Sequence, residues 1–174
     1  NSLSGGFAGI DALNGNGGTL TGISAASTWT LDGANPQYST AAATLDIVGF
    51  TTLQGGSAVD TFNVTGPSSF DLNGGLGNDK FFINDVLKGT ANGGGGNDTL
   101  DGQNSTGAVA LLGGDGNDVV IGSAQDDNLD GGLGADRLFG LAGDDTRNGG
   151  AGNDSLVGGD GNDRLVEAIN GNAV

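Results

Sequence analysis

Aspartates recur every nine residues in the last third of this 174-residue chain. Six nonapeptides follow one another in register over residues 113–166, and each has an aspartate at its sixth position. These aspartates are Asp118, Asp127, Asp136, Asp145, Asp154 and Asp163. Carboxylates at a fixed spacing suit a hard cation such as Ca2+, which takes about 6–8 oxygen ligands at about 2.3–2.6 Å. The spacing therefore predicts a row of cation sites.

Glycines precede each of these aspartates, mostly at the first, second and fourth positions of the nonapeptide. One carboxylate supplies at most two oxygens, so backbone carbonyls must complete each site. Glycine tolerates positive φ and lets a tight turn aim its carbonyls inward. Neighbouring parallel strands lie about 4.7–4.9 Å apart. A turn and the aspartate one coil later can therefore enclose one ion.

Each nonapeptide predicts a tight turn followed by a three-residue strand whose eighth position faces a thin core. That position is aliphatic in five of the six repeats, namely Val120, Leu129, Leu138, Leu156 and Leu165. Arg147 occupies it in the remaining repeat. Because an unpaired buried arginine is costly, we expect a distorted coil there, or an Arg147 side chain that swings out to pair with Asp144 or Asp145.

Related segments lie upstream. GGLGNDKFF (74–82) and GGGGNDTLD (93–101) match fully, whereas GGSAVDTFN (55–63) has Ala58 at the fourth position. The intervals predict coils of 18 to 20 residues whose aspartates stack in two opposite columns. The first column would contain Asp60, Asp79, Asp98, Asp118, Asp136 and Asp154, and the second Asp127, Asp145 and Asp163.

The pattern G-G-x-G-x-D-x-U-x, in which U is aliphatic, resembles the repeats of the RTX (repeats-in-toxin) family of secreted bacterial proteins. The resemblance implies an all-β fold, a right-handed parallel β-roll or β-helix solenoid with several Ca2+ ions bound in its turns. Ordinary Asp-Gly turns between strands are the alternative.

The resemblance also implies the ligands. They would be the carboxylates of Asp60, Asp79, Asp98, Asp118, Asp127, Asp136, Asp145, Asp154 and Asp163. First-position carbonyls of Gly74, Gly93, Gly113, Gly131, Gly149 and Gly158 would join them, with the third-position carbonyls of Leu76, Gly95, Asp115, Leu133, Ala151 and Asp160. Asp60 is a weaker candidate, and Asp11 weaker still. Ser123, Gln125 and Leu141 replace consensus glycines and weaken the sites of Asp127 and Asp145.

Composition limits the function. The chain has 38 glycines, 21 acidic residues and 5 basic ones, and all acidic residues except Glu167 are aspartate. A net charge of −16 argues against nucleic acid or an anionic membrane as a partner. There is no histidine or cysteine, which excludes a serine–histidine triad, a cysteine nucleophile and a zinc site on those ligands. We therefore expect no enzymatic activity within this segment. No apolar run is long enough to span a membrane, so we also expect no membrane insertion.

Four regions are expected along the chain. Residues 1–54 would form wider, metal-poor β coils, with β-prone runs at 28–31, 44–48 and 50–53; a separate small β domain is the alternative. Residues 55–112 would form coils with one calcium turn each. Residues 113–166 would form the regular roll, and residues 167–174 its C-terminal end. Because the chain starts without methionine, we expect a segment of a longer protein or a processed product.

The leading functional hypothesis is a calcium-stabilised structural module, secreted or on a bacterial cell surface, of an adhesin, surface layer or matrix fibre. It would self-associate, or pair with neighbouring repeats of a longer chain, through its ends or an apolar ninth-position row. That row contains Phe82, Asp101, Ile121, Phe139 and Val157. Two alternatives are a polysaccharide-binding accessory module, with Trp29, Tyr38 and Phe50 stacking on sugars, and a passive secretion or folding module of a type I-exported protein.

Overall fold

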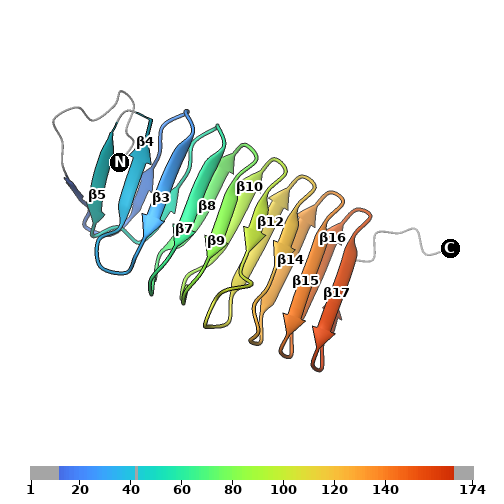
Figure 1. Ribbon diagram of the computed structural model, residues 1–174. Coiled ribbons are helices and arrows are strands. Elements are labelled where there is room, and N and C mark those ends of the chain that lie inside the picture. Colours follow the sequence, from blue (N-terminus) through green and yellow to red (C-terminus); the bar gives the residue numbers. More distant parts are fainter. Residues whose placement is uncertain (1–11, 42, 167–174) are drawn as a thin grey trace.

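Two β-sheets face each other in a computed structural model of the chain, which describes residues 12–41 and 43–166 (Figure 1). The ten-stranded sheet contains, in spatial order, β1 (Ala12–Asn14), β5 (Thr44–Val48), β4 (Gln37–Thr40), β3 (Ser27–Leu31), β7 (Asp60–Val64), β9 (Lys80–Ile83), β11 (Thr99–Asp101), β13 (Val119–Ile121), β15 (Arg137–Ala142) and β17 (Ser155–Asp160). The eight-stranded sheet contains β18 (Arg164–Val166), β16 (Thr146–Ala151), β14 (Asn128–Leu133), β12 (Ala110–Asp115), β10 (Ala91–Gly95), β8 (Asp71–Leu76), β6 (Thr52–Gln54) and β2 (Thr19–Thr21).

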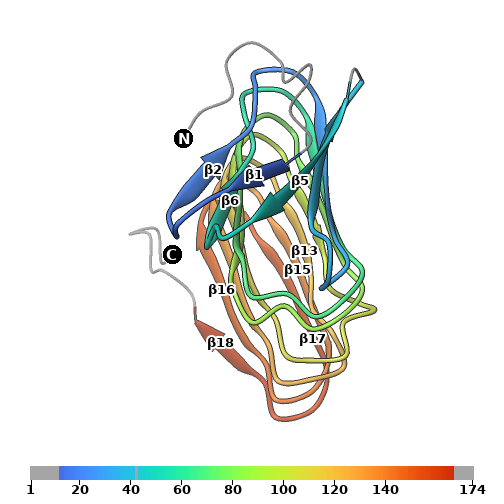
Figure 2. The same ribbon diagram turned by 90° about the vertical axis from the view of Figure 1, so that its left-hand side faces the viewer.

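From β6 onwards the chain alternates between the sheets, so that each coil adds one strand to each of them. Every strand pair in this part is parallel. The coils lie one behind another along a single axis (Figure 2). The predicted all-β parallel solenoid is confirmed, with about 6 turns. Over the described ranges there is no helix with the length and apolar character needed to cross a membrane.

The strands before β6 differ from the coils that the sequence predicts. β3 and β5 each pair antiparallel with β4, and β4 had no sequence signal. Nothing in the sequence indicated this antiparallel pairing, which arises because the chain reverses directly after β3. Asp32 Oδ1 accepts hydrogen bonds from the N–H groups of Ala34 (3.0 Å) and Asn35 (2.6 Å), which closes a tight turn into β4. Asp11 lies outside the described residues.

A single inward-facing row runs through the ten-stranded sheet. Trp29, Phe62 and Phe81 stack in register, with ring centroids 5.5 Å and 4.6 Å apart. Leu100, Val120 and Leu138 continue the row and are fully buried, which confirms that the eighth position faces the core. Leu165, on the last strand of the other sheet, is 52% exposed.

Trp29, Tyr38 and Phe50 all belong to this core. Tyr38 packs against Trp29 with ring centroids 4.3 Å apart, and both side chains are fully buried. The prediction that these three residues stack on sugars is wrong, because a sugar ring cannot reach them in the folded chain.

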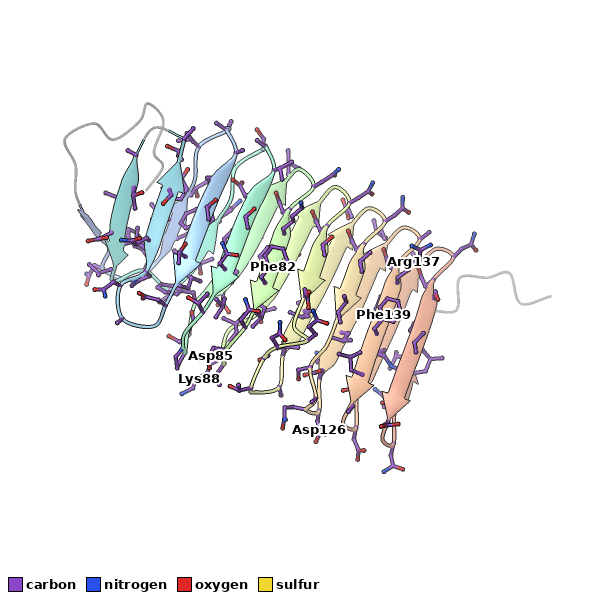
Figure 3. All side chains as sticks on the ribbon, in the orientation of Figure 1. Phe82, Asp85, Lys88, Asp126, Arg137 and Phe139 are labelled. Atoms are coloured by element: carbon purple, nitrogen blue, oxygen red, sulfur yellow. The ribbon has the colours of Figure 1, made fainter. Side chains whose placement is uncertain are left out.

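The ninth-position residues face outwards, as predicted. Phe82, Asp101, Ile121, Phe139 and Val157 pair in register across β9, β11, β13, β15 and β17. The first four are half-buried, and Val157 is exposed. Phe82 and Phe139 stand on the outer face of the ten-stranded sheet (Figure 3). We call these five residues the outer row.

Candidate metal centres

The two predicted columns of aspartates lie at opposite edges of the solenoid. Asp79 directly precedes β9, and Lys80 at the start of β9 pairs with Thr61 on one side and Thr99 on the other. The first column thus stacks in register where the chain enters the ten-stranded sheet. The second column precedes β14, β16 and β18, where the chain enters the eight-stranded sheet. Both predicted columns are confirmed.

A ladder of hydrogen bonds joins the stacked aspartates. In the first column the backbone N–H of Asp60, Asp79, Asp98, Asp118 and Asp136 donates to Oδ1 of the aspartate one coil later, at 2.7–3.0 Å. In the second column Asp127 donates to Asp145 (2.9 Å), and Asp145 donates to Asp163 (3.2 Å). The ladder fixes each acceptor carboxylate and leaves its second oxygen, Oδ2, free for another partner.

Five of these Oδ2 atoms are buried and have no hydrogen-bond partner. They belong to Asp79, Asp98, Asp118, Asp136 and Asp145, side chains that are only 1–2% exposed. A buried carboxylate oxygen without a partner is costly unless a cation neutralises it. These five oxygens therefore have the chemistry of cation ligands.

The first-position glycines leave room for such a cation. A methyl group on Gly74 would collide with Asp79 Oδ2 and with the carbonyl oxygen of Gly93, one coil later. The same pair of oxygens meets at Gly55, Gly93, Gly113 and Gly131 in the first column and at Gly122 and Gly140 in the second. A carboxylate and a carbonyl thus face one small space that only glycine keeps open. This donor set fits Ca2+, which prefers oxygen ligands.

Backbone carbonyls must provide most ligands, because residues 12–41 and 43–166 contain no group of three or more Asp, Glu, His or Cys side chains that could hold a metal. The predicted first-position carbonyls of Gly74, Gly93, Gly113, Gly131, Gly149 and Gly158 all face a carboxylate of the preceding coil. The third-position carbonyls differ. Those of Gly95, Asp115, Leu133, Ala151 and Asp160 accept a hydrogen bond from the fourth-position glycine of the preceding coil on the same side, at 2.7–2.9 Å.

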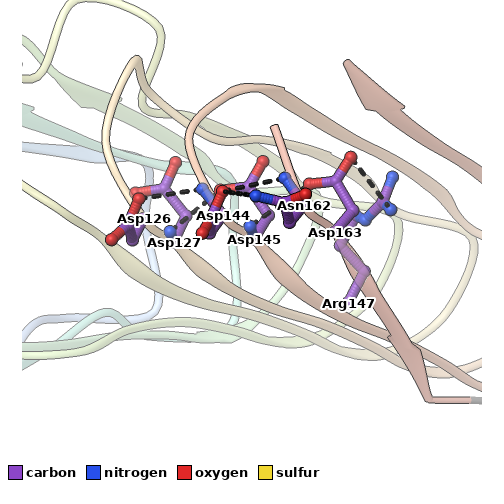
Figure 4. A network of polar contacts seen from close by, with 7 residues as sticks. All are labelled: Asp126, Asp127, Asp144, Asp145, Arg147, Asn162 and Asp163. Carbon is purple, nitrogen blue, oxygen red and sulfur yellow. Dashed lines mark hydrogen bonds and ion pairs between the residues drawn. The ribbon is translucent and has the colours of Figure 1, made fainter. Parts of the chain in front are cut away.

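Sequence reasoning missed a second ladder, formed by the fifth-position side chains on the outside of the turns. Asn78 Oδ1 accepts from the N–H of Asn97, and Asn97 Oδ1 accepts from Asn117, both at 2.8 Å. In the second column Asp126 and Asp144 take this role (Figure 4). The asparagine that precedes five of the nine stacked aspartates was the available signal. It stabilises the coil stack independently of the inner carboxylates.

Burial changes the acidity of the five aspartates with unpartnered Oδ2 atoms. It raises the pKa of Asp79 to about 7 and that of Asp118 to about 6, and the hydrogen bond from the preceding aspartate's N–H opposes part of this rise. Burial also raises the pKa of Asp98, Asp136 and Asp145. Without a cation, these carboxyls hold protons more tightly than exposed aspartates do.

Arg147 lies in the inward row of the eight-stranded sheet, where it pairs with Leu129 and Leu165, and is 6% exposed. Its Nη2 lies 3.7 Å from Asp163 Oδ2 (Figure 4). The prediction that it swings out to Asp144 or Asp145 is wrong. An inward strand position directs the side chain into the core, and the guanidinium meets the carboxylate of the next turn in that column.

Comparison with known proteins agrees with this geometry. The RTX calcium-binding nonapeptide repeat matches residues 84–105, 112–146 and 140–166, and repeats of this kind bind calcium. The match leaves out the turn at residues 74–79, whose inner oxygens are arranged like those of the matched turns. No curated protein and no solved structure matches the chain.

Gly93→Ala tests whether the space beside Asp98 holds an ion. The added methyl group would collide with Asp98 Oδ2 and the carbonyl oxygen of Gly113, so we expect one fewer bound Ca2+ and a loss of about 1–3 kcal/mol of unfolding free energy. Gly107→Ala is the matched control, since its methyl group would meet Val86 at an ordinary 3.4 Å. Equilibrium dialysis and thermal melts in calcium would measure both effects. Equal behaviour of the two variants would contradict the assignment.

The raised pKa values predict an unusual pH dependence of the calcium-free chain. A carboxyl whose pKa is higher in the folded chain than its ordinary 3.8 favours folding when protonated. The contribution of Asp79 is complete below about pH 4 and is lost as pH rises through about 7. We expect the melting temperature in metal-stripped buffer to fall as the pH rises from 4, until little folded chain remains near pH 7.5, and to fall less steeply in Asp79→Asn. A melting temperature that rises over this range would refute the prediction.

Proposed function

The chain belongs to the RTX family of calcium-binding repeat proteins through residues 84–166, and from this premise we propose that it is a structural module that folds around calcium ions outside the cell. The observation that carries the proposal is the set of five buried Oδ2 atoms, each facing a carbonyl oxygen of the next coil. An ion at each position would join consecutive coils. The glycine-rich turns would supply the remaining ligands.

Charge supports a folding role for these ions. The chain carries a net charge of −16, and its carboxylates stack at the spacing of neighbouring strands. From β10 onwards the strands contain three to six residues, and their buried apolar side chains are all aliphatic. When a metal site exists only in the folded state, metal binding free energy becomes folding free energy. Extracellular calcium modules bind with dissociation constants of about 10⁻⁴–10⁻³ M, a range that would leave such a chain unfolded in the cytoplasm.

A calcium titration followed by circular dichroism tests this proposal. In metal-stripped buffer near pH 7.5 we expect a spectrum with little β structure, and a cooperative change to a complete β spectrum at about 0.1–1 mM calcium. Magnesium is the control, because it demands octahedral geometry and gives up its waters reluctantly. A complete β spectrum without metal, or an equal response to magnesium, would refute calcium-driven folding.

We further propose that the module self-associates through the outer row. Phe82, Ile121, Phe139 and Val157 form an apolar line along the ten-stranded sheet, interrupted only by Asp101. Such a line of partly exposed apolar side chains favours contact with another protein surface. A second copy of the chain offers the same line, and an isologous contact would pair the two rows. This would suit a module of a fibre or a surface layer.

Phe139→Asp tests self-association. At saturating calcium we expect the unchanged chain to sediment as a dimer or larger species, and Phe139→Asp to sediment as a monomer, because a charge in an apolar contact is costly. Asn63→Asp is the matched control, since Asn63 pairs with Phe82 at the polar end of the same row. A monomer for the unchanged chain at high concentration would rule out this role of the outer row.

A further inference from the structure

The nine stacked aspartates do not share one environment. Five have a buried Oδ2 without a partner, as described above. At Asp60, Asp127 and Asp163, by contrast, groups of the protein itself reach Oδ2. Asp154 is half-buried, and no later coil in the described residues supplies a carbonyl to it. Each column therefore contains aspartates whose Oδ2 has a partner in the protein and aspartates whose Oδ2 has none.

At Asp60 and Asp127 the turn closes on its own carboxylate. Asp60 Oδ2 accepts the backbone N–H of Gly56 at 2.7 Å, and Asp127 Oδ2 accepts that of Ser123. Their Oδ1 atoms are also satisfied. Asp60 Oδ1 accepts the backbone N–H and the hydroxyl of Ser27, and Asp127 Oδ1 accepts the N–H of Val109 (2.8 Å) and the Ser123 hydroxyl (3.0 Å). Neither carboxylate lacks a partner.

The fourth position of the repeat explains the closure. In the other turns this position is glycine with φ between +114° and +146°, a region that residues with a Cβ rarely adopt. The turns of Asp60 and Asp127 have Ala58 and Gln125 there, and no residue of either turn has positive φ. Leu141, at the second position before Asp145, does adopt a φ of 82°. Its turn keeps Gly143 at the fourth position and stays open, so the fourth residue decides the form.

At Asp163 the turn is open, but a protein cation faces it. A methyl group on Gly158 would meet Asp163 Oδ2 and Arg147 Nη2, whereas the equivalent glycines of the earlier coils, from Gly55 to Gly140, meet Oδ2 and a carbonyl oxygen. The guanidinium therefore stands on the side where the next coil would contribute its carbonyl. It supplies a tethered positive charge to the last carboxylate of the second column (Figure 4).

We infer that Asp60, Asp127 and Asp163 are held by the protein's own groups and bind no calcium ion, and that residues 58, 125 and 147 determine this. The inference rests on the proposed calcium-binding function. The repeat pattern predicts that these three carboxylates are calcium ligands, whereas the inference makes them partners of groups within the protein. The calcium sites are then the open turns whose Oδ2 has no partner in the protein.

Calcium stoichiometry at saturation, measured by equilibrium dialysis on the full chain, tests the inference. Asp60→Asn and Asp127→Asn should leave the number of bound ions unchanged. Asp163→Asn should do so when made together with Arg147→Leu, which avoids an unpaired buried charge. The matched variants Asp79→Asn, Asp118→Asn and Asp145→Asn should each lose one ion. Circular dichroism in calcium verifies that each variant is folded. Loss of an ion in any of the first three would overturn the inference for that residue.

A gain of binding tests the fourth position. Ala58→Gly completes the consensus turn before Asp60 and should add one bound ion, while Ala135→Gly, at the fifth position before Asp136, should add none. An unchanged count in Ala58→Gly would overturn the role of residue 58. The two proposals fail differently: a chain that binds no calcium refutes the proposed function, whereas a chain that binds calcium and loses an ion in Asp60→Asn refutes only the inference.

Discussion

Burial of stacked carboxylates is the constraint on which the rest of the solenoid depends. Each aspartate of a column accepts the preceding aspartate's N–H through Oδ1, and this ladder sets the register of the coils. The ladder also leaves Oδ2 in the interior, where five such oxygens have no partner. Register and charge burial are thus inseparable in this fold. Whatever neutralises the carboxylates also holds the coils together.

The glycine pattern follows from the same constraint. The first-position glycine must lack a side chain because the carboxylate oxygen and the next coil's carbonyl occupy that direction. The fourth-position glycine must have positive φ, since otherwise the turn closes on its own aspartate, as at Asp60 and Asp127. The first-position and fourth-position glycines of one turn are therefore needed for different reasons. One keeps the space for a ligand open, and the other keeps the turn from filling it.

The nine-residue period was sufficient to predict the solenoid, both columns and the inward eighth position, because each is a direct consequence of spacing. It could not predict the antiparallel pairing of β4 with β3 and β5, because these residues carry no period and the reversal depends on one Asp32 turn. It also could not place Arg147. The sequence shows a charge at a core position, but the partner carboxylate lies one turn further along the same column. Ala58 and Gln125 were visible as departures, whereas their effect on Oδ2 required the turn geometry.

The first and the last described coils of the solenoid are stabilised by different interactions. At the N-terminal end, the Trp29, Phe62 and Phe81 rings form a broad core and Asp60 is satisfied by Ser27 and Gly56. Neither device needs a metal ion. At the C-terminal end the core narrows to aliphatic side chains, and Leu165 is largely uncovered. On the proposed mechanism, the dependence on calcium therefore increases along the chain, from an end that hydrophobic burial stabilises to coils that ions must join.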